Sequence, residues 1–121
     1  MGPARGRGSM VVPSPGAVIL VRFPFSDLSA TKFRPAVVIA WAGCEDWILA
    51  QVTSNPYADK DAVRLDYGSF ATGGLRHGSF VRPGKLFTAD ATLMVETAGL
   101  LHRPAFAQVV KAVVKIIQHG A

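Results

Sequence analysis

The feature that most constrains this fold is a change in hydrophobic period near the C-terminal end of the chain. Up to Thr97, apolar residues come in short runs or alternate with polar residues, as they do in β-strands. From Arg103 onward they recur at the spacing of an α-helix with one apolar face. Short strands followed by one amphipathic helix predict a mainly β fold: a small, partly open antiparallel barrel with the helix packed on its end or face.

Turn-forming residues divide the β-like region into short segments. Gly43–Asp46 predicts a tight turn between two of them, and a glycine-rich turn is expected at Ala71–Gly74. Pro83 and Gly84 interrupt an otherwise continuous run, which predicts a bend or bulge within one strand. The expected segments are Ala17–Phe23, Ala36–Ala42, Trp47–Thr53, Val63–Tyr67, Ser79–Arg82, Lys85–Thr88 and Leu93–Thr97.

The expected helix has one apolar and one polar face. Pro104 suits its first turn, Gly120 suits its C-terminal cap, and Lys115 and His119 lie near the negative end of the helix dipole. Its many β-branched residues lower the intrinsic helix propensity, so packing must hold it, and the apolar face is broad enough for a second subunit to share. The apolar positions are Phe106, Val109, Val110, Val113, Ile116 and Ile117, and the polar ones are Gln108, Lys111, Lys115 and Gln118.

Length and composition describe one ordinary globular domain. The 121 residues suffice for a single modest core, since half are hydrophobic and 17% are charged. Residues 1–15 are rich in glycine, proline and serine, which predicts a flexible tail before a folded domain at 16–121. Met10 is an alternative start, with the residues before it an extension.

Several classes of protein are excluded by what the sequence lacks. No apolar run approaches the roughly 20 residues of a membrane span. The single cysteine, Cys44, excludes an internal disulfide and leaves no cluster for a metal site. We therefore expect no metal or other cofactor, and a reducing cytoplasm as the natural setting. The phosphate-binding P-loop and the GxSxG and HExxH motifs are also missing.

The charge balance of the chain is basic. Thirteen Lys and Arg residues against eight Asp and Glu residues leave a net charge of +5. A charge of this size points only weakly to a polyanionic partner, because it governs solubility and non-specific binding rather than fold.

Polar side chains gather at the ends of expected strands. If the second and third strands are neighbours joined by a tight turn, Arg34 and Thr53 meet at the same edge of the sheet. A guanidinium offers a fixed fork of donors and threonine a hydroxyl on a stiff side chain, so together they suit an oxyanion such as phosphate. Alternatively, Arg34 pairs with Asp27 or Asp46 to tie down the loop, and Thr53 merely ends a strand.

The three histidines are far apart in the sequence. His77, in the loop sequence GGLRHGSFVR, is the one expected near a ligand. We expect His102 at the start of the helix and His119 on its exposed C-terminal end.

Three motifs in chain order resemble those of the MazF/PemK family of bacterial toxins. GAVILVRFPFSDLSATKFRPAVVIA is similar to that family's opening strand, FPF(T/S)DLS loop and Arg-Pro start of the next strand. LAQVTSN resembles its strand ending in Thr-Ser, and GGLRHGSFVRPGKLFTAD resembles its glycine-leucine turn and KLFT strand. The resemblance runs from Gly16 to the C-terminal helix.

This resemblance implies both a fold and an activity. Members of the family are homodimers with a compact Src-homology-3-like barrel, shared with the gyrase poison CcdB. They cut single-stranded RNA at short sequences without a metal, leaving 2′,3′-cyclic phosphate and 5′-hydroxyl ends. A cognate antitoxin neutralises each toxin, and here we expect one with an acidic tail that is disordered alone. The toxin–antitoxin complex is expected to bind DNA.

The resemblance also assigns residues. The family's catalytic arginine and threonine fall on Arg34 and Thr53. Ser29 stands where some members carry a glutamate, so a glutamate as general base is not available from that loop, and Ala17 replaces a common aspartate. The residues expected to bind the RNA are Lys32, Ser54, Arg76, His77, Ser79, Arg82 and Lys85.

A non-catalytic barrel is the alternative function. It would be a CcdB-like topoisomerase poison, a degenerate toxin or a protein-binding module. CcdB-type inhibition depends on exposed aromatic or apolar residues at the end of the C-terminal helix, and this chain ends in KIIQHGA, without tryptophan. That ending counts against a poison but not against a binding module.

Overall fold

The computed structural model of the protein describes residues 11–23 and 32–120. Residues 1–10, residues 24–31 with most of the FPFSDLS motif, and the side chains of Phe23 and Lys32 lie outside the described residues. The elements are β1 (Ala17–Phe23), β2 (Lys32–Gly43), β3 (Asp46–Thr53), β4 (Val63–Leu65), the 3-10 helix η2 (Tyr67–Ser69), β5 (Phe70–Gly73), β6 (Ser79–Asp90), the 3-10 helix η3 (Ala91–Leu93), β7 (Met94–Leu101) and the helix α1 (Arg103–His119).

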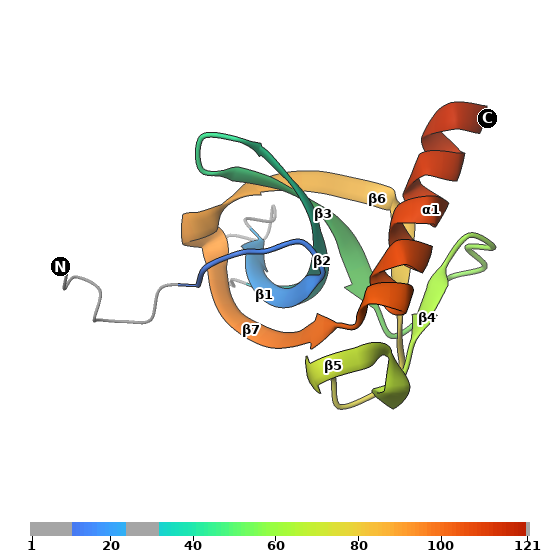
Figure 1. Ribbon diagram of the computed structural model, residues 1–121, viewed down its shortest axis with the longest axis horizontal. Coiled ribbons are helices and arrows are strands. Elements are labelled where there is room, and N and C mark those ends of the chain that lie inside the picture. The colour runs from blue at the N-terminus through green and yellow to red at the C-terminus, as the bar shows by residue number, and fades with distance from the viewer. Residues whose placement is uncertain (1–10, 24–31, 121) are drawn as a thin grey trace, which may run out of the picture.

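All seven strands belong to one antiparallel sheet. Their order across it is β4-β6-β3-β2-β1-β7-β5, so β2 and β3 lie near the middle and β4 and β5 form the two edges. The sheet curls around β1 without pairing its two edges, and α1 lies along the side formed by β4 and β6 (Figure 1). The fold predicted from the sequence, a partly open antiparallel barrel with a C-terminal helix, is confirmed.

Side chains of β1 alternate between two hydrophobic clusters. Ile19 and Val21 belong to a cluster formed by strand residues alone, which we call the strand cluster. Val18 belongs to a second cluster that includes Val109 of α1, which we call the helix cluster. Because both faces of β1 are covered, its sequence reads as a continuous apolar run rather than an alternating one. Val11, which composition assigned to the tail, packs against the strand cluster.

The helix α1 is capped at both ends. His102 is its N-cap: Nδ1 accepts a hydrogen bond from the Ala105 N–H at 3.1 Å, so the ring proton is on Nε2, which donates to the Gly68 carbonyl at 2.6 Å. Gly120 has a φ of 70° and its N–H bonds to the carbonyl of Ile116 at 3.0 Å, as expected for a glycine cap. No helix within the described residues is long and apolar enough to cross a membrane.

The buried face of α1 differs in part from the expected one. Val109 and Val113 are buried as predicted, together with Ala105. Ile117, expected on the apolar face, is 66% exposed, and Val114 on the neighbouring side is also exposed. The last turn of the helix extends beyond the sheet that covers the earlier turns (Figure 1).

Four strands differ from the expected ones: β5 was not expected, β2 begins earlier, β7 continues to Leu101 instead of ending at Thr97, and β4 ends at Leu65 because η2 begins at Tyr67. Ala71–Gly74 was expected as a turn, but its first three residues belong to β5, which pairs only with β7. Small residues and glycine obscure this strand, because an edge strand with one neighbour does not need the β-branched residues of a central strand. β2 begins at Lys32, four residues before the expected start, since Phe33 pairs with Arg22 in β1.

The bend expected at Pro83 and Gly84 is present. Ser79–Asp90 is a single strand, as predicted, and its pairing with β3 shifts register between the pairs Ala50–Leu86 and Val52–Val81. The four residues from Arg82 to Lys85 therefore form a bulge opposite one residue of β3.

Close backbone contact joins β5 to β7 and so fixes the start of the loop 74–78. Gly73 has a φ of 65° and lies opposite Gly99. A Cβ atom at Gly99 would lie 2.7 Å from the backbone nitrogen of Gly74, and a Cβ at Gly73 would overlap the carbonyl oxygen of Ala98. Neither position has room for a side chain.

We expect Gly99→Ala to lower the free energy of unfolding by roughly 1–3 kcal/mol, because the new methyl group meets backbone that cannot move aside. Gly84→Ala is the matched control in another strand: its Cβ would lie 3.6 Å from the nearest atom, Cδ1 of Ile116, which is ordinary contact. Urea unfolding of the three proteins measures the difference. Equal stability of Gly99→Ala and the wild type would show that β5 and β7 separate at little cost.

Candidate functional site

The pairing of β2 with β3 brings Arg34 and Thr53 to the same place. Ala36 and Gln51 are the last residues that pair at this end of the two strands. If the same register is continued by two residues, Arg34 lies opposite Thr53. Opposed residues of an antiparallel pair project to the same side of the sheet, so both side chains point the same way. The sequence prediction that these two residues meet at one edge is consistent with this register.

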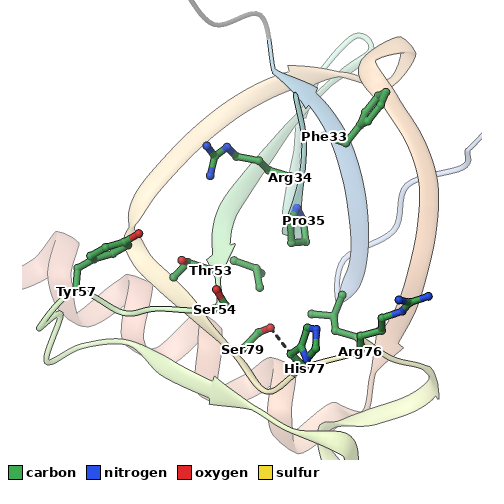
Figure 2. Close-up of a pocket in the computed structure, with 11 residues that line it drawn as sticks. Phe33, Arg34, Pro35, Thr53, Ser54, Tyr57, Arg76, His77 and Ser79 are labelled. Carbon is green, nitrogen blue, oxygen red and sulfur yellow. Dashed lines mark hydrogen bonds between the residues drawn. The ribbon is translucent and has the colours of Figure 1, made fainter. Parts of the chain in front are cut away.

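A cavity of about 540 Å³ opens at this end of the two strands. Figure 2 shows Arg34 on β2, Thr53 and Ser54 at the end of β3, Tyr57 to one side of them, and Arg76, His77 and Ser79 on the other. The lining residues are Phe33, Arg34, Pro35, Val52, Thr53, Ser54, Tyr57, Leu75, Arg76, His77 and Ser79.

The charged side chains that line this cavity are all basic. Among the described residues, Arg34 and Arg76 contribute guanidinium groups and no carboxylate lines the wall. Thr53, Ser54 and Tyr57 add hydroxyl groups, which can donate hydrogen bonds to an anion. The cavity therefore has the electrostatics and the donors that a phosphate requires.

Arg34 is held more rigidly than an arginine in a loop. It lies inside β2, opposite Val21 of β1, and not at the junction of loop and strand expected from the sequence. Its Nε atom is shielded from solvent while the side chain as a whole is half-buried. β2 pairs with β3 only from Ala36 onward, so at Pro35 it pairs with β1 alone. A proline, which has no N–H, is tolerated where a strand has one neighbour.

The hydroxyl of Thr53 is oriented by its own loop. Its Oγ1 donates to the carbonyl of Asn55 at 3.1 Å and accepts from the Asn55 N–H at 3.2 Å. This pair of bonds is a local turn of the kind that serine and threonine make at the ends of strands. The hydroxyl is thus fixed beside the cavity, and a ligand that bonds to it must share or replace the Asn55 carbonyl.

The loop between β5 and β6 supplies a second wall. Arg76 and His77 are exposed, and in Figure 2 the guanidinium of Arg76 is turned away from Thr53. Ser79 is buried, and its hydroxyl donates to the carbonyl of His77 at 3.1 Å, which ties the loop to the first residue of β6. Arg76, His77 and Ser79 therefore line the cavity, as Ser54 does.

Two of the expected RNA-binding residues, Arg82 and Lys85, do not line this cavity. Arg82 is turned into an ion pair with Asp59, at 3.0 Å between Nε and Oδ2, and lines a different cavity. Lys85 is exposed on the bulge of β6 and does not line the site cavity. The side chain of Lys32 lies outside the described residues.

Sequence reasoning missed Tyr57, Phe33 and Leu75, which also line the cavity. For Tyr57 a signal was present: an Asn-Pro pair immediately before it marks a loop, and an aromatic residue in a loop next to a site has no core to fill. Phe33 and Leu75 carry no comparable signal, because each is an ordinary hydrophobic residue beside a strand.

Asp90, an acidic residue of the described chain, has a structural role away from the cavity. Asp90 caps η3 and accepts hydrogen bonds from the N–H and the hydroxyl of Thr92, at 2.8 and 2.9 Å. These bonds, the backbone one first, hold the pKa of Asp90 below its ordinary value. Within residues 11–23 and 32–120, no group of three His, Cys, Asp or Glu side chains is placed to hold a metal ion.

Solved structures share this fold. MazF in a MazE–MazF crystal structure from Deinococcus radiodurans is 18% identical, with a TM-score of 0.70 over 89% of this chain and 97% of that one. The Mycobacterium tuberculosis toxin MazF-mt6 is 15% identical, with a TM-score of 0.66 over 84% and 96% of the two chains. An endoribonuclease in complex with its cognate antitoxin, from a mycobacterial species, is 12% identical, with a TM-score of 0.65 over 88% and 93%.

These likenesses define the class of fold. The chain has a small antiparallel barrel with one C-terminal helix, and that fold is the fold of the MazF toxins. No protein-family model matches the sequence. Comparison with curated protein sequences finds no match either.

We expect the Arg82–Asp59 pair to stabilise the loop 54–62. Its side chains are only 24% and 15% exposed, so a double-mutant cycle of Arg82→Ala and Asp59→Ala should give a coupling energy of about 1 kcal/mol in thermal unfolding. The Lys115–Asp61 pair is the control, since its atoms are 3.9 Å apart and its side chains 68% and 34% exposed. There the coupling should be at most a few tenths of a kcal/mol. A zero coupling for Arg82 would leave it available for RNA, as the sequence predicted.

Proposed function

We propose that this protein is an endoribonuclease toxin that cuts single-stranded RNA and is neutralised by a cognate antitoxin. The observation that carries the proposal is the convergence of Arg34 and Thr53 on one cavity lined by basic and hydroxyl groups. The fold supports it, because solved proteins with this fold are described as MazF toxins and endoribonucleases. The three sequence motifs point independently to the same activity.

In the proposed reaction, RNA supplies its own nucleophile. The 2′-oxygen attacks the neighbouring phosphorus, the bond from phosphorus to the 5′-oxygen breaks, and a 2′,3′-cyclic phosphate and a 5′-hydroxyl result. One proton leaves the 2′-hydroxyl and one is gained by the 5′-oxygen, so the protein must accept and return a proton. DNA lacks the 2′-hydroxyl and is not cut.

Arg34 stabilises the charge that develops on the phosphoryl oxygens during this attack. A guanidinium presents two parallel donors to two oxygens, and β2 holds it in place through its pairing with β1. Thr53 orients the phosphate through its hydroxyl, which the turn at Asn55 already holds at the cavity. The donors of Arg34 are fixed before the substrate arrives and cost no reorganisation when the charge appears, whereas the Thr53 hydroxyl must share or exchange its bond to the Asn55 carbonyl.

His77 is the side chain of the cavity wall best suited to the proton transfer. An imidazole ring can accept a proton at one nitrogen and donate one at the other, and the Ser79 bond to the His77 carbonyl anchors its backbone. Arg76 lies beside His77 in the same loop and adds electrostatic attraction for the RNA backbone. This contribution to the affinity falls as the salt concentration rises, and it distinguishes little between RNA sequences.

The proposed partners follow from the basic charge and from the exposed helix end. We propose a cytoplasmic homodimer whose interface is formed by the exposed face of α1, around Val114 and Ile117, in each subunit. The antitoxin carries an acidic segment that is disordered alone and folds over the basic RNA site, and the complex of the two binds DNA.

We expect Arg34→Ala and Thr53→Ala to lower the rate of RNA cleavage by about 10²–10³-fold or more, because each removes a fixed donor to the phosphate. Arg34→Lys should fail largely as well, since a point charge cannot reproduce the planar fork. Cleavage of a labelled, long unstructured RNA measures the rates, and circular dichroism confirms folding. Equal cleavage by a folded Arg34→Ala protein would return Arg34 to a structural role.

Cleavage should continue in the presence of EDTA, because the proposed reaction draws only on groups of the chain. The same RNA is incubated with wild-type protein before and after exhaustive chelation. A loss of activity that a divalent cation restores would contradict the proposed metal-independent mechanism.

We expect the protein to run in multi-angle light scattering at twice the 12.9 kDa of one chain. Ile117→Glu should shift it towards the monomer, because the charge would be buried in the proposed interface while this position is 66% exposed in one chain. Gln108→Glu, on the polar face of the same helix, is the control and should leave the dimer intact. A monomeric wild type at micromolar concentration would refute the shared helix face.

A further inference from the structure

The loop that carries Tyr57 holds two residues in a strained backbone conformation. Tyr57 has a φ of 53° and Ala58 a φ of 64°, which is the left-handed region that L-residues other than glycine and asparagine rarely adopt. Two such residues in succession cost free energy, and they persist only where the surroundings over-determine them. Neither residue is glycine or asparagine, so both positions carry side chains where this backbone conformation favours glycine.

Hydrogen bonds inside the loop impose this conformation. The Asn55 side chain accepts from the N–H of Tyr57 at 2.9 Å, and the Pro56 carbonyl accepts from the N–H of Asp59 at 2.9 Å. One carboxylate oxygen of Asp59 accepts from the Asp61 N–H at 2.9 Å while the other pairs with Arg82 at 3.0 Å. Asp59 therefore ties the strained loop to the bulge of β6.

The result of this construction is an aromatic ring placed at the rim of the site. Tyr57 is 68% exposed and lines the cavity that contains Arg34 and Thr53. In Figure 2 its hydroxyl end is directed towards Thr53. Within the described residues, the side chain of Tyr57 makes no hydrogen bond or ring contact of its own, so its ring face is open to a ligand.

Phe33, the other aromatic residue of the cavity, is in a different position. It is 51% exposed, but the guanidinium of Arg22 lies over its ring, 5.6 Å from the centroid. That cation–π contact occupies one ring face. Tyr57 differs from Phe33 in three respects: its backbone is strained, hydrogen bonds of its loop hold that backbone in place, and no cation of the described residues lies over its ring.

We propose that Tyr57 is a base-stacking residue, which receives the nucleobase next to the phosphate that Arg34 and Thr53 hold. The inference rests on the proposed function, since it assumes that a polynucleotide occupies the cavity. Bases of single-stranded RNA are unstacked and settle on aromatic side chains, with little preference for sequence. Asp59 and Arg82 are positioning residues for the ring, because their ion pair and the hydrogen bonds of the loop hold the backbone at Tyr57 in place.

Two non-cleavable probes separate stacking on Tyr57 from phosphate binding. One is a short, fluorescein-labelled 2′-O-methyl RNA of randomised sequence, and the other is the same strand with abasic sites in place of its nucleotides. Tyr57→Gly removes the ring and suits the positive φ, so its unfolding temperature should not fall below that of the wild type. Tyr67→Ala is the control, since Tyr67 is 94% exposed and does not line the cavity.

We expect Tyr57→Gly to raise the dissociation constant for the base-bearing probe about tenfold, measured by fluorescence anisotropy, and to leave that for the abasic probe unchanged. Tyr57→Phe should bind both probes as the wild type does, because it keeps the ring. Tyr67→Ala should also match the wild type. Wild-type affinity of Tyr57→Gly for the base-bearing probe, or an equal loss on both probes, would overturn the stacking role.

The positioning role of Asp59 has a separate readout. If Asp59→Ala acts through the ring, it weakens binding of the base-bearing probe in the wild-type background but adds nothing in the Tyr57→Gly background. Equal losses in both backgrounds would assign Asp59 to general loop stability. A wild-type protein that binds neither probe would instead refute the proposed function, and this inference with it, before any variant is compared.

Discussion

The position of β2 between β1 and β3 is the constraint on which the rest of the structure depends. Val37 pairs with both neighbouring strands and Val38 pairs with β3; both are fully buried, one in each hydrophobic cluster. A shift of one residue along either strand would exchange the two faces and move each side chain into the opposite cluster, so the packing of both clusters determines the register. Arg34 and Thr53 inherit their relative position from that register.

Around these fixed strands, the site takes its other groups from loops that are tied down in different ways. Asn55 binds the hydroxyl of Thr53 and the N–H of Tyr57, so one side chain and its backbone organise both the proposed phosphate site and the ring beside it. Ser79 anchors the opposite loop through the His77 carbonyl. The cavity thus combines rigid donors from the sheet with loop groups held by a few short-range bonds.

The sequence predicted the strands with strong patterns and the pairing of β2 with β3, because continuous apolar runs and a tight turn at Gly43–Asp46 leave few alternatives. It did not predict β5, whose edge position demands no hydrophobic pattern. The meeting of Arg34 and Thr53 at one end of these two strands could be predicted from strand order alone. The ion pair between Arg82 and Asp59 was not, because its partners are 23 residues apart and meet only through the bulge of β6.

The open edges of the barrel bear on how such a protein stays in solution. A sheet that does not close leaves unpaired backbone groups on its outermost strands, and these invite another chain to add to the sheet. Here the edges are β4 and β5, which are only three and four residues long, and β4 carries the exposed Arg64. Edge strands this short, one of them carrying a charge, make a poor template for growth into fibrils, so an incomplete barrel need not be an aggregating one.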